Sequence, residues 1–342
     1  MALLSFEIAL RIFPLHPINL KELHPYLGSF NIPYREGWFF LIGCDEFLTY
    51  IKINSKGLRD VEHSYEKPPD RKRILLLGDS FIEGLQVDLE KILARRLERK
   101  LSEKGYDVEV INAGMSGYGT DQEVLFYELE GYKYDPDIVI LFLLVGNDLT
   151  DVLNKKLKPY FEMENETLVI KNYPTSYTQS SFYKVKEFIR KNILYHFRTW
   201  FFLTDTLNII IRGKYLGKKR DRFEVYKNDY SYSWRIVELL VLRLRRELEE
   251  KNKTLIFVYI PSDVELINNV TDLNLSEHRV RFLNFCKNEN LSCIDLFPYL
   301  KKYYRETSIF PYFTKCDRHW NEYGHEIAAE IIKDYLIENQ YL

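Results

Sequence analysis

The sequence lacks several features that point to common functions. Its 342 residues hold only four cysteines, Cys44, Cys286, Cys293 and Cys316. No two of them form a Cys-x-x-Cys pair, so zinc-ribbon and thioredoxin-like chemistry are not indicated, and the even number permits disulfides without showing them. With 48 Lys and Arg against 50 Asp and Glu, the formal net charge is −2. This balance offers no basic excess that would favour nucleic acid as a partner.

A long apolar run is also missing. No stretch reaches the roughly 20 apolar residues that a helix needs to cross a bilayer. Residues 1–13 are apolar but include Glu7 and Arg11, and they lack the basic start and the cleavage site of a signal peptide. Two interpretations stand. The segment is the first helix of a soluble domain, which favours a cytoplasmic protein, or the trimmed end of an anchor, which favours a membrane-associated or extracytoplasmic one.

A regular alternation of strands and helices begins after Pro68-Pro69-Asp70. Short apolar runs predict strands at 73–77, 107–111, 137–144, 254–260 and 291–295. The segments between and after them predict helices at 88–104, 120–132, 233–251, 276–289 and 321–338, the first with Asp88 as its N-cap. Five strands that alternate with helices predict a parallel sheet covered on both faces, within an α/β domain over residues 71–342.

Two segments depart from this pattern. Residues 1–70 are interpreted as an irregular extension packed on the core, with one strand-like alternation at 50–54. Residues 155–235 are interpreted as a mostly helical insertion. The insertion is rich in aromatic side chains, which form either the core of the added helices or a pocket for acyl or sugar groups: Phe182, Tyr183, Phe188, Tyr195, Phe197, Trp200, Phe201 and Phe202.

Four short motifs occur at the ends of predicted strands or before the last helix. They are Gly78-Asp79-Ser80, Asn112-Ala113-Gly114-Met115-Ser116-Gly117, Gly146-Asn147-Asp148 and Asp317-Arg318-His319-Trp320. Each alone is commonly a turn. Because the carboxyl ends of parallel strands meet at one edge of a sheet, all four are expected to meet there.

The residue types in these motifs fit nucleophilic catalysis. A serine hydroxyl needs a base within hydrogen-bond reach, and His319 suits taking the proton of Ser80. Asp317 would orient the imidazole and stabilise its charged form. His325 is a weaker candidate base, since it falls nearly two turns into the last helix. A metal site of Cys316 with His319 and His325 is not favoured, because histidines six residues apart lie on different helix faces.

Three hydrogen-bond donors are expected to stabilise the oxyanion. They are the backbone N–H groups of Ser80 and Gly117 and the side-chain amide of Asn147. The remaining motif residues, Asp79, Gly114, Asp148 and Trp320, are expected to support these groups.

Through these motifs the chain resembles the SGNH/GDSL hydrolase superfamily over residues 72–152 and 253–338. The resemblance implies a flavodoxin-like, three-layer α/β/α fold with Ser80, Asp317 and His319 as a triad. It also implies Gly117 and Asn147 in the oxyanion hole, and no metal or organic cofactor. One departure is the spacing Asp-x-His, where these hydrolases have Asp-x-x-His. The shorter spacing is similar to that of SGNH-like alginate O-acetyltransferases.

The predicted function is a serine ester hydrolase that removes acyl groups from a carbohydrate, a lipid or a small ester. An O-acyltransferase that modifies a polysaccharide is the alternative, because it shares the same acyl-enzyme. We favour hydrolysis because the sequence shows no acceptor site. A catalytically silent module predicts instead that Ser80 has no histidine within reach, or that the insertion fills the cleft. A nucleotide site is disfavoured, because the turn from Gly78 to Gly84 lacks the glycine spacing that cradles a pyrophosphate.

Overall fold

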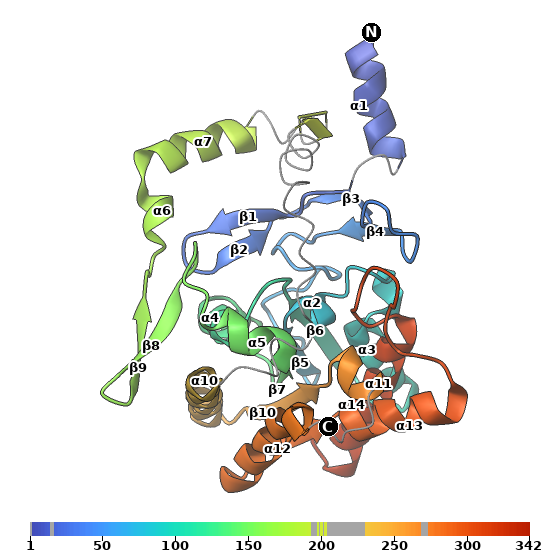
Figure 1. Ribbon diagram of the computed structural model, residues 1–342, viewed down its shortest axis with the longest axis vertical. Helices are drawn as coiled ribbons and strands as arrows, with labels where there is room; N and C mark the ends of the chain where they lie inside the picture. Colours follow the sequence, from blue (N-terminus) through green and yellow to red (C-terminus); the bar gives the residue numbers. More distant parts are fainter. Residues whose placement is uncertain are drawn as a thin grey trace.

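A five-stranded parallel sheet forms the centre of the molecule (Figure 1). The computed structural model describes residues 2–13, 17–192, 197, 199–200, 202–203, 230–267 and 273–342. In spatial order the strands are β11, β10, β7, β5 and β6. Their bounds are β5 (Lys72–Gly78), β6 (Val108–Gly114), β7 (Ile138–Leu144), β10 (Thr254–Ile260) and β11 (Ser292–Asp295). These bounds confirm the five predicted strands to within a few residues, and the strand order is that of flavodoxin-like sheets.

The strands form where the sequence is continuously apolar. All seven residues of β7 are buried, since this strand lies in the middle of the sheet with helices over both faces. A strand that is covered on both sides needs apolar residues on both sides, which explains the unbroken run Ile138–Leu144.

Helices cover the two faces of the sheet and complete the three layers. On one face, apolar side chains pack from α4 (Thr120–Leu129), α10 (Ser231–Glu249) and α12 (Leu273–Asn288). On the other, they pack from α3 (Leu93–Glu103), α13 (Phe297–Thr307) and α14 (Glu322–Glu338).

Two predicted helices have different bounds. The helix predicted from 88 begins as a 3₁₀ turn, Leu89–Lys91, and α3 follows only after the extended residue Ile92. Asp88 is the N-cap residue of this 3₁₀ turn, but its side chain makes no capping hydrogen bond. The helix predicted to reach residue 132 ends at Leu129 and is followed by a second 3₁₀ turn, Gly131–Tyr134.

The extension is more regular than predicted. It contains α1 (Ala2–Ile12) and two antiparallel hairpins, β1–β2 (Lys21–His24 and Gly28–Asn31) and β3–β4 (Glu36–Phe39 and Thr49–Lys52). Leu20, Ile51 and Ile53 form a small apolar cluster with Leu85 of the sheet domain. The alternation at 50–54 corresponds to β4, but the other three short strands of the extension were not recognised in sequence. The domain boundary near residue 70 stays a prediction.

The part of the insertion that the structure describes contains a hairpin as well as helices. It begins with a hairpin of β8 (Tyr160–Glu164) and β9 (Thr167–Lys171), which α6 (Ser176–Gln179) and α7 (Ser181–Asn192) follow. The exposed aromatic side chains Phe182, Phe188, Phe197 and Trp200 do not form the predicted core of added helices. Tyr195 and Phe201 lie outside the described residues.

Candidate active site

The turn between β5 and α2 (Ser80–Glu83) places Ser80 at the carboxyl edge of the sheet. Asp79 is the N-cap of this helix, and its carboxylate accepts a 2.8 Å hydrogen bond from the backbone N–H of Phe81. A Cβ at Gly78 would lie 2.4 Å from Ile82 Cγ1, so the turn has no room for a side chain there. Strand order reverses between β5 and β7, and ligands of open α/β sheets bind at such a switch point.

Ser80, His319 and Asp317 form one hydrogen-bonded chain. The Nε2 atom of His319 lies 2.7 Å from Ser80 Oγ, and Nδ1 lies 2.6 Å from Asp317 Oδ1. Asp317 Oδ1 also accepts from the backbone N–H of His319 at 2.7 Å. With Nδ1 carrying its proton toward the carboxylate, Nε2 is an acceptor for the serine hydroxyl. Ser80 and His319 are 239 positions apart in sequence.

The pKa values of the pair are displaced in opposite directions. Burial lowers the pKa of His319, but the hydrogen bond and the charge of Asp317 outweigh it, so the net pKa lies above the usual 6.5. Burial raises the pKa of Asp317, and the hydrogen bonds and charge of His319 outweigh that effect, so its net pKa is lowered. Asp317 therefore stays ionised while His319 gains or loses a proton.

His325 is not placed as a base for Ser80. Its ring is buried, and Nδ1 accepts a 3.2 Å hydrogen bond from the backbone N–H of Leu93. Burial lowers its pKa to about 3, with Arg59 and Arg96 adding to the effect. The His325 imidazole is therefore neutral and already accepts a hydrogen bond from the backbone. It contributes to packing and does not act as the base for Ser80. Trp320, also buried, lies edge-on to His325 and to Phe81.

The loop that ends in Gly117 is fixed by a carboxylate that the sequence analysis missed. Glu83 Oε2 accepts hydrogen bonds from the backbone N–H of Ser116, at 2.7 Å, and from the Ser116 hydroxyl. Burial raises the pKa of Glu83, but the Lys21 ammonium and these hydrogen bonds outweigh it and lower the net pKa. Gly117 has a φ of +81°, a backbone conformation that favours glycine. The hydrogen bonds to Glu83 therefore fix this loop at Ser116, one residue before Gly117.

Gly114 allows α2 to lie close to β6. A Cβ at this position would be 2.3 Å from the backbone nitrogen of Glu83. A side chain there would push away the helix that carries both Ser80 and Glu83.

Asn147, in α5 (Val145–Asp151), is tied to the residue before the serine. Its Nδ2 donates to Asp79 Oδ2 at 2.9 Å. Asp148 is fully buried, and its Oδ2 accepts from the backbone N–H of Leu144 at 2.7 Å. Burial and the neighbouring charges of Glu123 and Asp79 raise the pKa of Asp148 well above its usual range. A protonated Asp148 avoids the cost of burying another negative charge beside Asp79.

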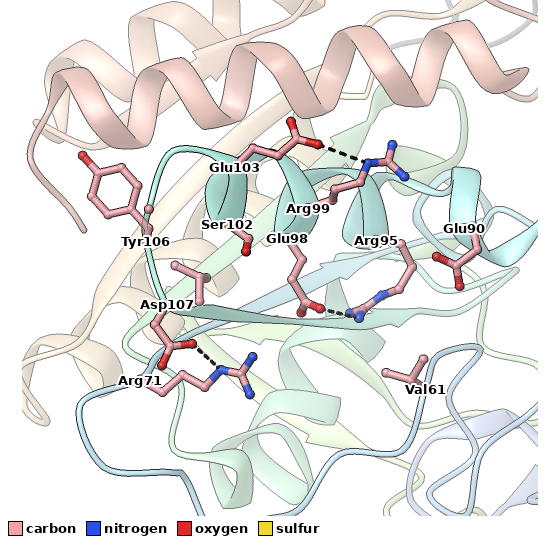
Figure 2. A pocket seen from close by; sticks show the side chains of 12 residues that line it. Val61, Arg71, Glu90, Arg95, Glu98, Arg99, Ser102, Glu103, Tyr106 and Asp107 are labelled. Carbon is pink, nitrogen blue, oxygen red and sulfur yellow. Dashed lines mark hydrogen bonds and ion pairs between the residues drawn. The ribbon is translucent and has the colours of Figure 1, made fainter.

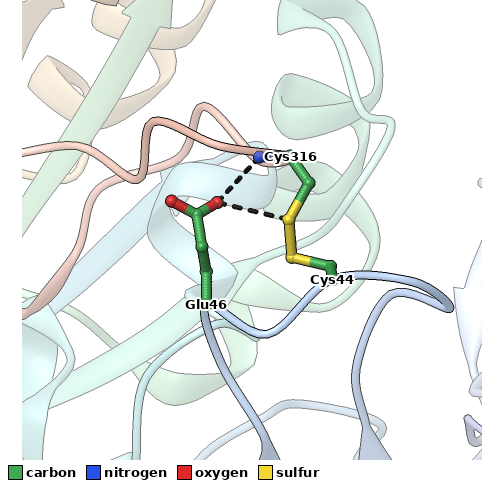
Figure 3. A group of neighbouring side chains, drawn as sticks. All are labelled: Cys44, Glu46 and Cys316. Atoms are coloured by element: carbon green, nitrogen blue, oxygen red, sulfur yellow. Dashed lines mark hydrogen bonds between the residues drawn. A yellow bond between two sulfur atoms is a disulfide. The ribbon is translucent and has the colours of Figure 1, made fainter.

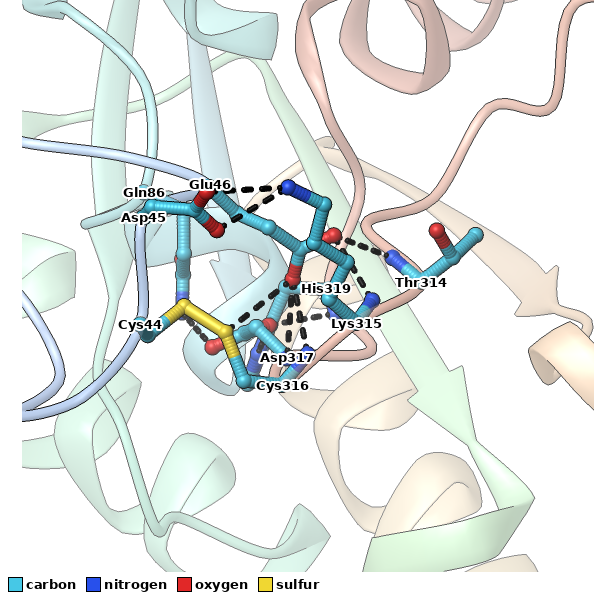
Figure 4. Close-up of a disulfide and its surroundings, with 9 residues drawn as sticks. All are labelled: Cys44, Asp45, Glu46, Gln86, Thr314, Lys315, Cys316, Asp317 and His319. Carbon is cyan, nitrogen blue, oxygen red and sulfur yellow. Dashed lines mark hydrogen bonds and ion pairs between the residues drawn. A yellow bond between two sulfur atoms is a disulfide. The ribbon is translucent and has the colours of Figure 1, made fainter.

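The loop before His319 is held by the N-terminal extension. Cys44 is disulfide-bonded to Cys316 (Figure 3). The Glu46 carboxylate accepts hydrogen bonds from the backbone N–H groups of four successive residues, Thr314, Lys315, Cys316 and Asp317, at 2.7–3.2 Å (Figure 4). Gln86 donates to the second carboxylate oxygen of Asp317 at 3.2 Å. This arrangement was not predicted from the sequence. The one available signal was the even number of cysteines, which permits disulfides.

The cluster of Cys44, Glu46 and Cys316 does not fit a metal ion. Zinc and similar ions bind the thiolate form of cysteine. Here the two sulfur atoms are bonded to each other, and the Glu46 carboxylate is occupied by backbone donors. The arrangement fits a covalent tether with a carboxylate clamp.

A hollow of about 760 Å³ lies at the opposite edge of the sheet, beside α3 and the beginning of β6 (Figure 2). Arg71, Arg95, Glu98 and Asp107 line it with charged side chains. It contains none of the four motifs, so it is not part of the candidate site.

Three solved structures with similar chain traces are distant from this chain in sequence. A lipolytic protein of the G-D-S-L family from Desulfitobacterium hafniense DCB-2 has 12% identity and a TM-score of 0.42, over 78% of this chain and 99% of that chain. A lipase/acylhydrolase from Enterococcus faecalis has 15% identity and a TM-score of 0.43, over 78% and 96%. The acetyl xylan esterase AlAXEase has 15% identity and a TM-score of 0.42, over 78% and 98%.

No curated protein matches the chain. The family of GDSL-like lipases/acylhydrolases matches residues 74–332, which is well over half of the sequence. The match begins in β5, ends in α14 and includes all four motifs. By this match, the chain is a member of the GDSL-like lipase/acylhydrolase family.

Proposed function

We propose that this protein is a serine ester hydrolase that acts through an acyl-enzyme on Ser80. The observation that carries the proposal is the continuous hydrogen-bonded chain from Ser80 through His319 to Asp317, with distances of 2.7 and 2.6 Å. One of the two alternative predictions of a catalytically silent module, that no histidine lies within reach of Ser80, is wrong. Family membership supports the same reaction class.

In the first half of the reaction, Ser80 Oγ attacks the ester carbonyl while His319 Nε2 takes the hydroxyl proton. Asp317 stabilises the imidazolium through the hydrogen bond to Nδ1. The proton then passes to the leaving alcohol as the carbon–oxygen bond breaks, which leaves an acyl-Ser80 ester. In the second half, His319 takes a proton from water while the water oxygen attacks the acyl carbon. The bond between that carbon and Ser80 Oγ then breaks, His319 returns the proton to Ser80 Oγ, and the carboxylic acid leaves.

The negative charge on the carbonyl oxygen needs donors in both halves. We assign them to the backbone N–H groups of Ser80 and Gly117 and to the Asn147 amide, all at the carboxyl edge of the sheet. Asp79 accepts from one amide hydrogen of Asn147, which fixes the plane of the amide and leaves the other hydrogen for substrate. Loss of one such donor typically costs about 2.7–4 kcal/mol of transition-state stabilisation.

The substrate is an ester of a carbohydrate, a lipid or a small alcohol. The test is release of p-nitrophenol from acetate and longer acyl esters, with and without oligosaccharide acceptors. The intact chain is compared with Ser80→Ala and with Ser102→Ala, a control on the exposed surface of α3. Steady turnover that only Ser80→Ala abolishes supports the hydrolase.

An O-acyltransferase is the second candidate, on the observation that the spacing between Asp317 and His319 is Asp-x-His. It predicts a stoichiometric burst that turns over only when an acceptor is added. Equal activity in the intact chain and Ser80→Ala would contradict both candidates.

We also propose an extracytoplasmic location. All four cysteines are paired, as Cys44–Cys316 and Cys286–Cys293. Structural disulfides persist in oxidising compartments and are rare in the cytosol. Thiol titration of denatured protein taken directly from cells should find no free thiol before reduction and four after it. Four free thiols before reduction would contradict this location.

A further inference from the structure

Polar side chains of helix α7 contact the extension. The Tyr183 hydroxyl donates a 2.8 Å hydrogen bond to the carbonyl of Leu23 in β1. Arg190 lies 2.8 Å from Glu187 and 3.8 Å from Glu22, also in β1. Residues 183, 187 and 190 are spaced four and three apart, so they share one face of the helix. This polar face is the one that lies toward the extension.

The apolar side chains of α7 point the other way. Phe182, Val185 and Ile189 are exposed, Phe182 to 73% and Val185 to 61%. Their spacing of three and four also defines one face, on the side away from Tyr183 and Arg190. A surface helix of a soluble domain normally turns its apolar stripe to the core and its charges to water. In α7 this orientation is inverted.

Lysines border the exposed stripe on both sides. At 100° per residue, the exposed Phe188 widens the stripe on the side of Val185. Lys184 lies beyond Phe188 and Lys186 lies beyond Phe182, and both lysines are exposed. Long lysine side chains in this position can extend their ammonium groups to a headgroup layer while the apolar stripe is buried in lipid. The charge pattern therefore complements an anionic surface.

Helix α1 buries Glu7 and Leu10 but exposes other apolar residues. The buried Glu7 carboxylate accepts hydrogen bonds from the backbone N–H and the hydroxyl of Thr199, at 2.8 and 2.7 Å. The apolar residues Leu4, Ile8 and Ile12, at intervals of four, are exposed instead. Figure 1 shows α1 and α7 at the same end of the molecule, beyond the hairpins of the extension.

We propose that α1 and α7 form a docking surface for a lipid bilayer with anionic headgroups. Helices with an apolar stripe and flanking lysines lie in the plane of a membrane interface. No helix among the described residues is long and apolar enough to span a bilayer, so the contact is peripheral in this part of the chain. Exposed apolar residues on two helices at one end of the molecule supply the apolar contact, and Lys184 and Lys186 supply the electrostatic attraction.

The test is binding of the full chain to vesicles. Phosphatidylcholine vesicles are compared with vesicles that contain about one third phosphatidylglycerol. The variants are Phe182→Asp with Val185→Asp, and Lys184→Gln with Lys186→Gln. The matched control is Val280→Asp, because Val280 is a helical valine of similar exposure in α12. Circular dichroism and thermal unfolding establish that each variant is folded, and the assay needs no esterase activity.

We expect binding to the anionic vesicles and much weaker binding to the neutral ones. Each lysine removed should weaken binding about five-fold. The Phe182 and Val185 pair should weaken it by more than about ten-fold, because two apolar contacts are replaced by negative charges. Val280→Asp should bind as the intact chain does.

Three results would overturn the proposal. The first is no binding to either vesicle. The second is equal loss of binding in Val280→Asp. The third is a dimer in sedimentation that the Phe182 and Val185 variant converts to a monomer, which would show that a second copy covers this surface.

Discussion

Cys44 of the N-terminal extension is covalently bonded to Cys316, the residue immediately before Asp317. The bond joins residues 272 positions apart. Next to it, the Glu46 carboxylate holds the backbone from Thr314 to Asp317. The extension therefore fixes the loop that carries the proposed base and its carboxylate. In sequence the extension lies outside the sheet domain, but in the folded protein it is part of the candidate active site.

Removing this tether should affect stability and activity together. In the double variant Cys44→Ser, Cys316→Ser, the unfolded chain regains the entropy of a very long loop, so the free energy of unfolding should fall by up to about 5 kcal/mol. The esterase rate should also fall, because the position of His319 becomes less fixed. Urea unfolding and p-nitrophenyl acetate turnover measure the two effects.

The second disulfide provides the control. Cys286 and Cys293 are seven residues apart, far from Ser80 in sequence, and the same entropy model gives about 2 kcal/mol for so short a loop. Replacing that pair with serine should lower stability and leave turnover of the folded enzyme unchanged. If both double variants lost activity to the same extent, the tether would have no specific effect on the site.

Glu83 should act as a positioning residue for the oxyanion loop. In Glu83→Gln the side chain keeps its size but loses the charge that binds Ser116 and Lys21. A hydrogen bond to a charged group contributes about 1.5–3 kcal/mol, so kcat should fall about 10- to 100-fold while KM changes little. Lys21→Met removes the ion pair with Glu83 but keeps the hydrogen bonds between Glu83 and Ser116. It should therefore lower kcat less than Glu83→Gln does. An unchanged kcat in Glu83→Gln would contradict this role.

Asn147→Ala should reduce kcat about 10²- to 10³-fold, as expected for the loss of one oxyanion donor. The melting temperature should change little, because the Asn147 amide makes a single side-chain hydrogen bond, to Asp79. Steady-state kinetics and thermal unfolding together test this. A loss of activity that follows a loss of folded protein would indicate a structural role instead.

The acid limb of the pH–rate profile should report His319. Catalysis needs its neutral form, and Asp317 raises its pKa above 6.5. The rate should therefore rise with pH through a midpoint above 6.5. In Asp317→Asn that midpoint should move to lower pH along with a loss of rate, since the stabilising charge is gone. An acid limb that does not move would mean that another group controls it.

Stability should depend on a buried histidine that joins the extension to the sheet. His63 lies 3.0 Å from Asp60 and 2.6 Å from Glu109 of β6. Burial lowers the pKa of His63, but these two carboxylates outweigh it and raise the net pKa to about 9. The imidazolium form is thus favoured by folding. Its stabilisation, on the order of 3 kcal/mol, is complete below pH 6.5 and is lost as the pH rises toward 9.

Urea unfolding at pH 6, 7.5 and 9 tests this dependence. His63→Gln, which cannot carry the charge, should reduce the fall in stability between pH 6.5 and 9. A wild-type free energy of unfolding that stays constant over this range would contradict the prediction.

The sequence was most informative about the sheet. A strand buried on both faces must be apolar along its whole length, so Ile138–Leu144 could be recognised without a structure. The same strands end in Gly78-Asp79-Ser80 and Gly146-Asn147-Asp148, and parallel strands bring those ends together. The family and the candidate triad follow from these local patterns.

The sequence was least informative where few residues form a contact over a long separation. The short strands of the extension depend on pairing with each other, and Glu83 reads as one more polar residue of a helical turn. Its burial against Lys21 and Ser116 arises only when β1 lies beside the loop after β6.

The five strands and the pairing of Ser80 with His319 were within reach of the sequence alone, because local periodicity and motif chemistry carry them. The flavodoxin-like architecture was implied by the family resemblance. Only the tertiary structure decided which cysteine pairs with Cys316 and which side of α7 faces outward. Those features depend on distances between segments remote in the chain, such as the Cys44–Cys316 separation of 272 residues. Residue spacing indicates which face of a helix or strand is apolar and where that element ends. Only the packing of the folded chain determines which residues each face contacts.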